Sequence, residues 1–511
     1  MSPKTIQTLN PRTGNFLAQE YVISTPEELN QKVTDAQLAF MVYRNTSGNE
    51  RAILLETIAD EIEAVKEEIL SIATLETGLP AGRIQGETGR TLGQLRLFAE
   101  VAQEEFWVEA SIDTALPDRQ PLPKSDIRKC LVPLGPIAVF GASNFPLAFS
   151  TAGGDTASAL ASGNPVIVKA HNSHLGTHQC ICDAIARALE RCNLPKGIFS
   201  SIIDEGYELG ADLVQHPGIK AVGFTGSFNG GTALLDLVSK RKEPIPFYGE
   251  MGSINPIVLL PSALEDPKMV STLMGSINMG VGQFCTNPGL ILAIEGEAAQ
   301  HFCLKMTDAI QQTLGEVMLN RAIYDKYEAS IAEMSSEKAY TLLGQGTKAQ
   351  GALAVQPSLA LTSGKKFLTH PKMSQEIFGP YSLIVLCEHQ EELAEILMQI
   401  EGQLTLSFMG EETEFEEQVH LIVLAQEKVG RIIFNGVPTG VEVGHSMIHG
   451  GPFPATTAPN STSVGADAIK RFARPVCFQD APQSLLPMAL QDENPLKIFR
   501  KINGKWSLDK I

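Results

Sequence analysis

Short apolar runs alternate with helical segments between residues 135 and 225, and this alternation constrains the fold more than any other feature of the sequence. The runs have the length of buried strands, whereas the segments between them carry apolar residues at helical spacing. The predicted strands are 136–140, 165–168, 199–203 and 221–224, and the predicted helices are 148–162, 176–192 and 207–215. This order predicts an α/β fold, with a parallel sheet covered by helices on both faces. A second series runs from about 255 to 450, with no low-complexity linker between the two.

The N-terminal part of the chain is predicted to be a mainly helical scaffold. Two short strands are expected around the turn at residues 10–14. Thr25 and Glu28 then form a capping box with Pro26 at the first helical position, which predicts a helix to about residue 43. Apolar residues recur at helical spacing over 50–76, and a further helix is predicted over 89–105.

Length and charge limit the class of protein. At 511 residues the chain exceeds one ordinary hydrophobic core, so two or more lobes are expected. Forty basic and 58 acidic residues give a formal charge of −18, which disfavours nucleic acid and anionic membranes as partners. The first eight residues have no apolar signal region, and no run of 18 apolar residues follows. We therefore expect a cytoplasmic protein.

Cys285 is the most informative single residue, because it lies among small and turn-forming residues in the run 282–289. Such surroundings favour a reactive thiol, although a lone cysteine is more often a small buried hydrophobe. The eight cysteines are scattered without the spacing of a zinc site or a disulfide framework. Cys180 and Cys182 lie near His178, but two residues apart on a helix they point to different sides, so no metal site is predicted.

Glu250 lies 35 residues before Cys285, in an apolar stretch between Gly249 and Gly252. A carboxylate in this setting is a candidate general base, and the alternative is an ion-paired or capping glutamate. A second candidate feature is the glycine-rich turn with Gly226, Ser227 and Gly231, which follows a predicted strand and opens a helix. Its backbone N–H groups and the helix dipole suit a pyrophosphate, although the bare glycine pattern is weak evidence.

Five motifs, in order from about residue 130 to 450, resemble those of the aldehyde dehydrogenase superfamily. They are Ser143-Asn144-Phe145-Pro146, Phe224-Thr225-Gly226-Ser227, the Glu250 and Cys285 segments, and Glu376-Ile377-Phe378-Gly379-Pro380. Two later motifs, 436–441 and 449–455, are similar to one branch, the α-ketoglutaric semialdehyde dehydrogenases and the related NADP-dependent fatty aldehyde dehydrogenases.

The resemblance implies a Rossmann-like cofactor domain, an α/β catalytic domain and a small bridging sheet. The implied boundaries are 1–117 and 137–252 for the NAD(P)-binding domain and 253–450 for the catalytic domain. Segments 118–136 and 474–511 would form the bridging sheet that joins subunits into a homodimer or homotetramer.

The resemblance also assigns roles to single residues. Cys285 would be the nucleophile, Glu250 the base that activates water, and Asn144 a donor to the oxyanion, although Asn144 equally fits a turn before a proline. Lys169 would contact the adenosine ribose, and Glu376, next to Phe378, the nicotinamide ribose. Their alternatives are a solvated lysine at a strand end and a surface turn. Asn435 matches an asparagine that supports the site.

The implied activity is NAD(P)-dependent oxidation of an aldehyde to an acid. Relatives that prefer NAD typically carry a glutamate where this chain has Asn172, so the repulsion of a 2′-phosphate is absent and NADP is favoured over NAD. The expected substrate is α-ketoglutaric semialdehyde (2,5-dioxopentanoate), and the alternative is a medium or long-chain fatty aldehyde. A catalytically silent binding protein of the same fold is the alternative from another class.

Overall fold

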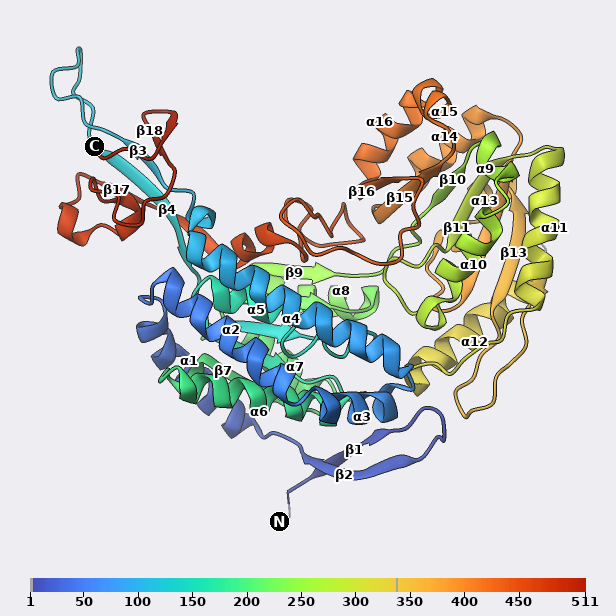
Figure 1. Ribbon diagram of the computed structural model, residues 1–511, viewed down its shortest axis with the longest axis horizontal. Coiled ribbons are helices and arrows are strands. Elements are labelled where there is room, and N and C mark those ends of the chain that lie inside the picture. The colour runs from blue at the N-terminus through green and yellow to red at the C-terminus, as the bar shows by residue number, and fades with distance from the viewer. Residues whose placement is uncertain (1–2, 337–338) are drawn as a thin grey trace.

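The computed structural model describes residues 3–336 and 339–511, which form two lobes and a projecting arm (Figure 1). The first lobe contains a parallel five-stranded sheet in the order β7-β6-β5-β8-β9. Its strands are β5 (Ile137–Phe140), β6 (Val166–Lys169), β7 (Phe199–Ile202), β8 (Ala221–Thr225) and β9 (Phe247–Glu250). The helices between them are α5 (Gly154–Ala161), α6 (Leu175–Arg191), α7 (Glu208–Gln215) and α8 (Phe228–Ser239). The predicted parallel α/β arrangement is confirmed.

Alternate residues of β5 enter different hydrophobic cores. Ile137 and Val139 pack into the core shared with the N-terminal helices, whereas Ala138 and Phe140 pack into a smaller core with α7 and α8. Because side chains of a strand point to opposite faces in turn, both faces of this sheet are buried. The strand therefore reads as a continuous apolar run in the sequence.

One predicted helix of this lobe is wrong in its extent. The sequence predicted a helix over 148–162, but α5 begins only at Gly154. The preceding residues form turns, because the Glu87 carboxylate accepts hydrogen bonds from the backbone N–H groups of Leu147 and Ala148. These N–H groups are thus satisfied by a side chain from a distant helix, which a local pattern does not reveal.

The N-terminal scaffold agrees with the prediction except at two boundaries. The strands β1 (Thr5–Leu9) and β2 (Phe16–Val22) pair antiparallel, and α1 (Pro26–Tyr43) begins with the predicted capping box. The helical pattern over 50–76 belongs to two helices, α2 (Gly48–Ala64) and α3 (Lys66–Thr77), which meet at Val65 with φ of −108°. The helix predicted over 89–105 is α4 (Ala81–Glu104), and it begins directly after Pro80.

The second lobe contains a seven-stranded sheet in the order β12-β13-β14-β11-β10-β15-β16, parallel except for β12. Its strands are β10 (Ile257–Leu259), β11 (Leu290–Ile294), β12 (Thr341–Gln345), β13 (Ser358–Ser363), β14 (Tyr381–Cys387), β15 (Gln403–Met409) and β16 (Val429–Phe434). Its helices are α9 (Pro261–Glu265), α10 (Met269–Asn278), α11 (Glu297–Gln311), α12 (Arg321–Ser336), α13 (Gly364–Thr369), α14 (Gln390–Gln399), α15 (Glu412–Glu417) and α16 (Val419–Lys428). Separate hydrophobic cores lie on the two faces of the sheet.

The arm is a third sheet, in the order β17-β4-β3-β18-β19. Its strands are β3 (Ser111–Asp113), β4 (Ile127–Pro133), β17 (Ala473–Gln479), β18 (Arg500–Ile502) and β19 (Lys505–Ser507), and it projects from the first lobe in Figure 1. Strand β3 lies before residue 118, so this sheet uses more of the chain than the predicted bridging segments. The domain boundaries and the joining of subunits stay predictions.

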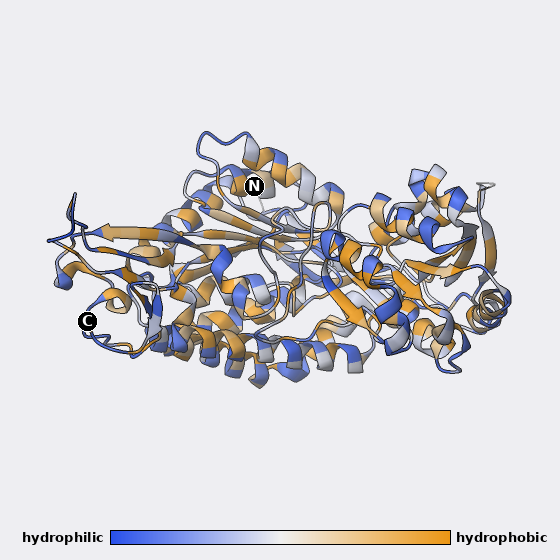
Figure 2. Cartoon of the chain, turned by 90° about the horizontal axis from the view of Figure 1, so that it is seen from above, coloured by the Kyte–Doolittle hydropathy of each residue, from blue (hydrophilic) through white to orange (hydrophobic). Residues whose placement is uncertain are grey.

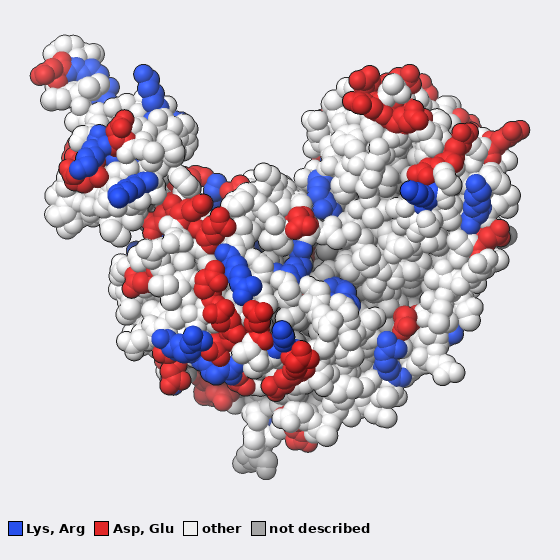
Figure 3. All heavy atoms as spheres, in the orientation of Figure 1, with Lys and Arg blue, Asp and Glu red and all other residues white. Residues whose placement is uncertain are grey.

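The surface agrees with a chain that buries large cores. The strands of the main sheets are largely hydrophobic, and hydrophilic residues lie mostly on outer helices and loops (Figure 2). Figure 3 shows acidic side chains gathered on the lower face of the first lobe and on the top of the second, with several Lys and Arg in the hollow between the lobes. None of the helices in the described residues is long and apolar enough to cross a membrane.

Candidate active site

The candidate site lies between the edges of the two large sheets. Glu250 ends β9 and Lys169 ends β6, so both belong to the carboxyl edge of the first sheet. Cys285 precedes β11 and Glu376 precedes β14, at the amino edge of the second sheet. Ligand sites of parallel α/β sheets lie outside the carboxyl ends of the strands, so the position suits a nucleotide and a nucleophile from different lobes.

The backbone before Cys285 is unusual. Gly280, Val281 and Gly282 have consecutive positive φ angles of 55°, 62° and 63°. A β-branched residue rarely takes such a conformation, and strain of about 1–3 kcal/mol per residue is typical of functional sites. A Cβ atom on Gly282 would lie 2.1 Å from the carbonyl oxygen of Gly379. The segment therefore turns sharply against the Gly379 loop and presents Cys285 between the lobes.

The side chain of Asn255 holds the Cys285 loop by hydrogen bonds to its backbone. Its side chain is fully buried, and Nδ2 donates hydrogen bonds to the carbonyl oxygens of Cys285 at 2.8 Å and Asn287 at 2.9 Å. Its Oδ1 accepts from the hydroxyls of Ser253 and Thr405, each at 3.0 Å. Because four groups converge on one buried amide, the nucleophile is held by packing and hydrogen bonds from β10 and β15.

Cys285 and Glu250 are brought together by a residue that the sequence analysis did not assign to the site. Nε2 of His449 lies 2.7 Å from Oε1 of Glu250 and 3.5 Å from Sγ of Cys285. His449 is 1% exposed and Glu250 is 3% exposed. Both neighbours therefore face the same ring nitrogen, as an ion-pair contact to the carboxylate and a hydrogen bond to the sulfur.

The electrostatics of His449 follow from these two neighbours. Burial by itself would lower the pKa of His449, but the charges of Glu250 and Cys285, with their hydrogen bonds, raise the pKa to about 10. The ring is therefore charged at neutral pH. The hydroxyl of Ser463 donates to the other oxygen of Glu250, so both carboxylate oxygens have a polar neighbour in a buried place.

Asn144 lies beside the nucleophile, in the loop after β5. Its Nδ2 donates a hydrogen bond of 2.9 Å to the carbonyl oxygen of Gln283, two residues before Cys285. An amide nitrogen carries two N–H groups, so one remains for an oxyanion formed at Cys285. The geometry agrees with the predicted place of Asn144, and its role stays a prediction.

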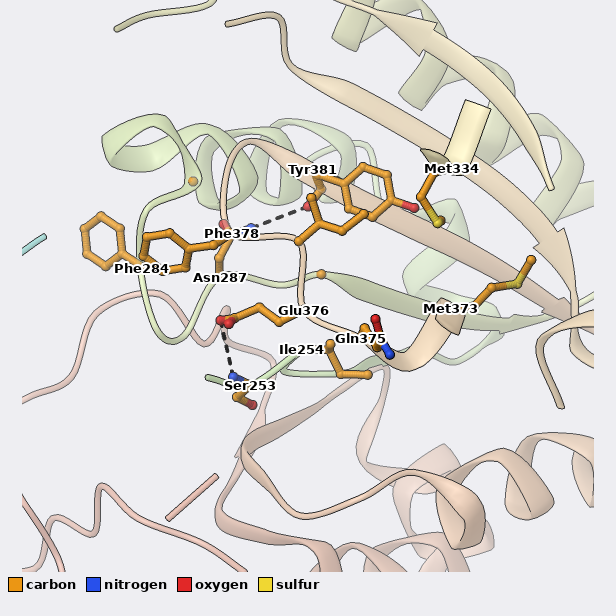
Figure 4. A pocket seen from close by; sticks show the side chains of 13 residues that line it. Ser253, Ile254, Phe284, Asn287, Met334, Met373, Gln375, Glu376, Phe378 and Tyr381 are labelled. Carbon is orange, nitrogen blue, oxygen red and sulfur yellow. Dashed lines mark hydrogen bonds between the residues drawn. The ribbon is translucent and has the colours of Figure 1, made fainter. Parts of the chain in front are cut away.

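Glu376 and Phe378 line a small pocket on the other side of the Cys285 loop, together with Phe284 and Ser253. Figure 4 shows Glu376 pointing toward Ser253, whose backbone N–H donates to Oε1 at 3.3 Å. Burial raises the pKa of Glu376 to about 7, with smaller opposing effects from that N–H and from Lys326. A Cβ on Gly252 would lie 2.1 Å from Oε2 of Glu376, so only glycine leaves room for this carboxylate.

The predicted phosphate-binding turn forms as expected. Ser227 caps α8, and its Oγ accepts a hydrogen bond of 3.2 Å from the N–H of Gly230. The backbone N–H of Gly226 donates to the carbonyl oxygen of Glu250 at 3.0 Å, which ties the turn directly to the candidate base. A Cβ on Gly231 would lie 2.6 Å from Sδ of Met251, so this glycine permits close packing of helix on strand.

Lys169 and Asn172 lie at the carboxyl end of β6, as predicted. Burial lowers the pKa of Lys169, and the nearby Asp204 opposes this effect. Nδ2 of Asn172 donates to the carbonyl oxygen of Asp204 at 2.8 Å. Oδ1 of Asn172 is buried and has no hydrogen-bond partner in residues 3–336 and 339–511. This open acceptor and the exposed first turn of α8 fit a nucleotide cofactor.

The cysteines near His178 are not part of any group of three or more possible metal ligands within 4.8 Å of one another among the described residues. Cys182 lies 3.3 Å from Nε2 of His178, but Nδ1 of His178 faces the hydroxyl of Thr151 at 2.7 Å. In the part of the chain that the structure describes, Cys285, Glu250 and His449 are the only group of possible metal ligands whose ligand atoms lie within 4.8 Å of one another. The expectation that the protein needs no metal stays a prediction.

Sequence reasoning missed His449, Ser463 and Asn255. His449 opens the motif 449–455, which was noted only as a marker of one branch. It lies 164 residues from Cys285, so no local pattern joins the two. Asn435 bonds to the backbone of Gly410 through both its nitrogen and its oxygen, and its supporting role stays a prediction.

The fold and this cluster can now be compared with known proteins. The model of the Aldehyde dehydrogenase family matches residues 1–452. The chain belongs to the aldehyde dehydrogenase family. The α-ketoglutaric semialdehyde dehydrogenase 2 of Azospirillum brasilense is 46% identical to this chain over 507 residues, covering 99% of this chain and 97% of the relative.

Two further relatives agree with the family. The α-ketoglutaric semialdehyde dehydrogenase of Acinetobacter baylyi is 43% identical over 507 residues, covering 98% of this aldehyde dehydrogenase and 95% of the relative. Among solved structures, aldehyde dehydrogenase 21 of Physcomitrella patens, in complex with the reaction product succinate, has a TM-score of 0.80 at 19% identity. The match covers 94% of this chain and 95% of that chain, and it establishes the fold alone.

Proposed function

We propose that this aldehyde dehydrogenase oxidises α-ketoglutaric semialdehyde to 2-oxoglutarate, with NADP preferred over NAD. One observation carries the chemistry: Cys285 and Glu250 come from different segments and both contact Nε2 of His449 in a buried place. The substrate is proposed from two relatives of that name, at 46% and 43% identity over nearly the whole chain.

Cys285 is the proposed nucleophile. Its thiolate adds to the aldehyde carbon, and the carbonyl oxygen becomes an oxyanion that the free N–H of Asn144 stabilises. When bound, NAD(P) supplies the hydride acceptor that converts the sulfur adduct to a thioester. The turn at Gly226 and Ser227, together with Lys169, Asn172, Glu376 and Phe378, is proposed to hold this cofactor.

Glu250 is the proposed base for release of the acid. It takes a proton from water, the water oxygen adds to the thioester carbon, and the Cys285 thiolate leaves. His449 is a positioning residue in this scheme, because its N–H lies between the carboxylate and the sulfur. A cation at this place stabilises the negative charge of the thiolate when it is released.

Cofactor choice is proposed to depend on Asn172. Because this residue is neutral, it does not repel a 2′-phosphate, and its open Oδ1 accepts from a hydroxyl. Introducing a carboxylate by Asn172→Glu should lower kcat/KM with NADP by about tenfold and leave kcat/KM with NAD within about threefold. Asn435→Asp, which adds a carboxylate away from this strand end, is the control. An unchanged NADP to NAD ratio in Asn172→Glu contradicts the proposal.

The substrate proposal is tested by a kcat/KM panel of 2,5-dioxopentanoate, succinic semialdehyde, pentanal and decanal, each with NAD and with NADP. We expect 2,5-dioxopentanoate to exceed pentanal by at least tenfold. A preference for decanal supports the alternative, a fatty aldehyde dehydrogenase. No turnover of any aldehyde, with intact cofactor binding, supports a catalytically silent protein of the same fold.

The arm is proposed to join subunits into a homodimer or homotetramer in the cytoplasm. Its last strand and the following residues expose Trp506 and Leu508, at 66% and 48%. Exposed apolar side chains that lie together favour contact with another chain. Light scattering of the full chain tests this, and Trp506→Lys should lower the oligomer mass if the arm forms the contact.

A further inference from the structure

Two arginines near the candidate nucleophile have open hydrogen-bond donors. Nε and Nη2 of Arg90 and Nε of Arg431 are buried and have no hydrogen-bond partner in the described residues, 3–336 and 339–511. Across the same residues, neither guanidinium forms an ion pair with a carboxylate. Buried donors are normally satisfied. A single open Nε recurs at Arg51, Arg83 and Arg500, but Arg90 alone among the described arginines leaves both Nε and Nη2 buried and open, which points to a missing anionic partner.

The neighbouring Arg83 differs from Arg90 because it has an acidic partner on the same helix, although its Nε is also buried without a hydrogen-bond partner in the described residues. Arg83, Glu87, Arg90 and Gln94 follow one another at helical spacing on the inner face of α4. Arg83 pairs with Glu87 at 2.9 Å, and Glu87 in turn holds the loop at residues 147–148. Arg90 lies one turn further along, and no carboxylate of the described residues forms an ion pair with it, although the charges of Glu87 and Glu442 act on it from further away.

The motif 436–441, which marks the branch in the sequence, holds both guanidiniums. The carbonyl oxygen of Val441 accepts from Nη1 of Arg90. The carbonyl oxygens of Pro438 and Gly440 accept from Nη2 and Nη1 of Arg431, at 2.8 and 3.3 Å. The loop thus fixes the two side chains by their outer nitrogens. It leaves the Nε and Nη2 edge of Arg90 open, which is a fork that matches the two oxygens of a carboxylate.

Both arginines are close to Cys285. The guanidinium carbon of Arg90 lies 5.6 Å from the ring centroid of Phe149, and that ring lies 6.2 Å from the ring of His449, which contacts Cys285. Burial lowers the pKa of Arg90 and of Arg431, and the charge of Cys285 opposes this effect in each case. Neither arginine lines the pocket that contains Glu376.

We propose that Arg90 binds the carboxylate of an α-keto acid semialdehyde through its open edge, with Nε of Arg431 as a further donor to the same end of the molecule. This inference rests on the proposed function and names the residues that select its substrate. Four C–C bonds separate the aldehyde carbon of 2,5-dioxopentanoate from its carboxylate carbon, roughly 5 Å when extended. One end can therefore react at Cys285 while the other is bound by a cation beside it.

The test compares charged and uncharged aldehydes of one length. For Arg90→Gln, kcat/KM for 2,5-dioxopentanoate should fall by about 100-fold, because a bidentate charged contact is lost, while kcat/KM for pentanal stays within about threefold. Arg431→Gln should show a smaller loss, about tenfold, confined to the charged substrate. Arg96→Gln, on the same helix but with a solvent-exposed ion pair to Glu63, is the matched control.

A second measurement separates binding from an effect on the nucleophile. The unreactive analogue 2-oxopentanoate should inhibit the parent enzyme competitively with the aldehyde, and its inhibition constant should rise about 100-fold in Arg90→Gln. Arg90→Lys keeps the charge and loses the fork, so it should recover only part of the affinity. Thermal unfolding checks that each variant is folded, and Arg90→Lys replaces Arg90→Gln if the latter is not.

The outcomes are distinct. A parent enzyme that uses pentanal as well as 2,5-dioxopentanoate contradicts the proposed function. In a second outcome the parent prefers 2,5-dioxopentanoate, but Arg90→Gln loses activity equally on both aldehydes and still binds 2-oxopentanoate. This outcome contradicts binding of the substrate carboxylate by Arg90 and leaves the proposed function in place. A loss confined to the charged aldehyde, with weaker inhibition by 2-oxopentanoate, supports binding of the carboxylate by Arg90.

Discussion

Glu250 and Glu376 are two carboxylates on opposite sides of the Cys285 loop, the first buried and the second half-buried, and their surroundings differ. Glu250 lies 2.7 Å from a charged His449 and accepts from the hydroxyl of Ser463. Glu376 has one backbone N–H at 3.3 Å, and burial raises its pKa to about 7. The difference teaches that two acids beside one loop can have very different polar surroundings. A charged ring and a hydroxyl face Glu250, whereas Glu376 has few partners to offset its burial, which raises its pKa.

The largest effect is expected from removing the sulfur of Cys285, which shares its neighbour His449 with Glu250. Cys285→Ser should reduce aldehyde oxidation by about 1,000-fold or more, because a serine hydroxyl is far less ionised than a thiol, while cofactor binding stays near normal. Steady-state kinetics and cofactor titration measure both quantities. Cys192→Ser, directly after α6, is the control. Activity of Cys285→Ser within tenfold of the parent contradicts the assignment.

Glu250→Gln should lower steady turnover by about 100- to 1,000-fold, because the water is no longer activated. The first turnover should still deliver hydride, so a burst of reduced cofactor is expected together with an acylated Cys285 in the mass spectrum. The same change at the other carboxylate, Glu376→Gln, should leave no acyl adduct. An acyl adduct in both variants, or in neither, contradicts the different roles that we propose for Glu250 and Glu376.

His449→Gln tests whether the ring beside Glu250 accounts for the difference in function that we expect between Glu250 and Glu376. We expect kcat/KM to fall by about 100-fold, since the cation between Glu250 and Cys285 is lost. His445→Gln, at an exposed position of the same loop, is the control. Because the pKa of His449 is raised to about 10, its contribution to stability is complete below pH 6.5 and is lost as pH rises through about 10. Equal activity of both variants would exclude a role for the ring.

The smallest effect is expected at Glu376 and concerns stability. Its folded pKa, about 7, lies above the ordinary value of 4.5, so the folded state favours the neutral acid and loses stability as pH rises from 4.5 through 7. Glu376→Gln removes this loss. Without cofactor, its apparent Tm should exceed that of the parent by about 1–3 °C at pH 8 and equal it near pH 4.5. A Tm difference that does not depend on pH contradicts the assigned cause.

Much of the fold followed from local patterns. The apolar runs of the first sheet, the capping box at Thr25 and the turn at Ser227 each depend on residues close in sequence. The extent of the predicted helix over 148–162 was wrong because a side chain distant in sequence binds backbone N–H groups at its start. Residues 148–153 are not helical because Glu87 binds the N–H groups of residues 147–148, and the pattern over 50–76 did not reveal the break at Val65.

By itself the sequence determined the parallel α/β fold, the family resemblance and the places of Cys285, Glu250, Glu376 and the glycine turn. These depend on residue types and short spacings, which a linear pattern contains. Only the tertiary structure decided that His449 lies between Glu250 and Cys285 and that Asn255 holds the nucleophile loop. It also decided that Arg90 and Arg431 keep open donors beside this cluster. The physical reason is that these contacts join separate segments of the chain, and the residues that meet in them are up to 351 positions apart.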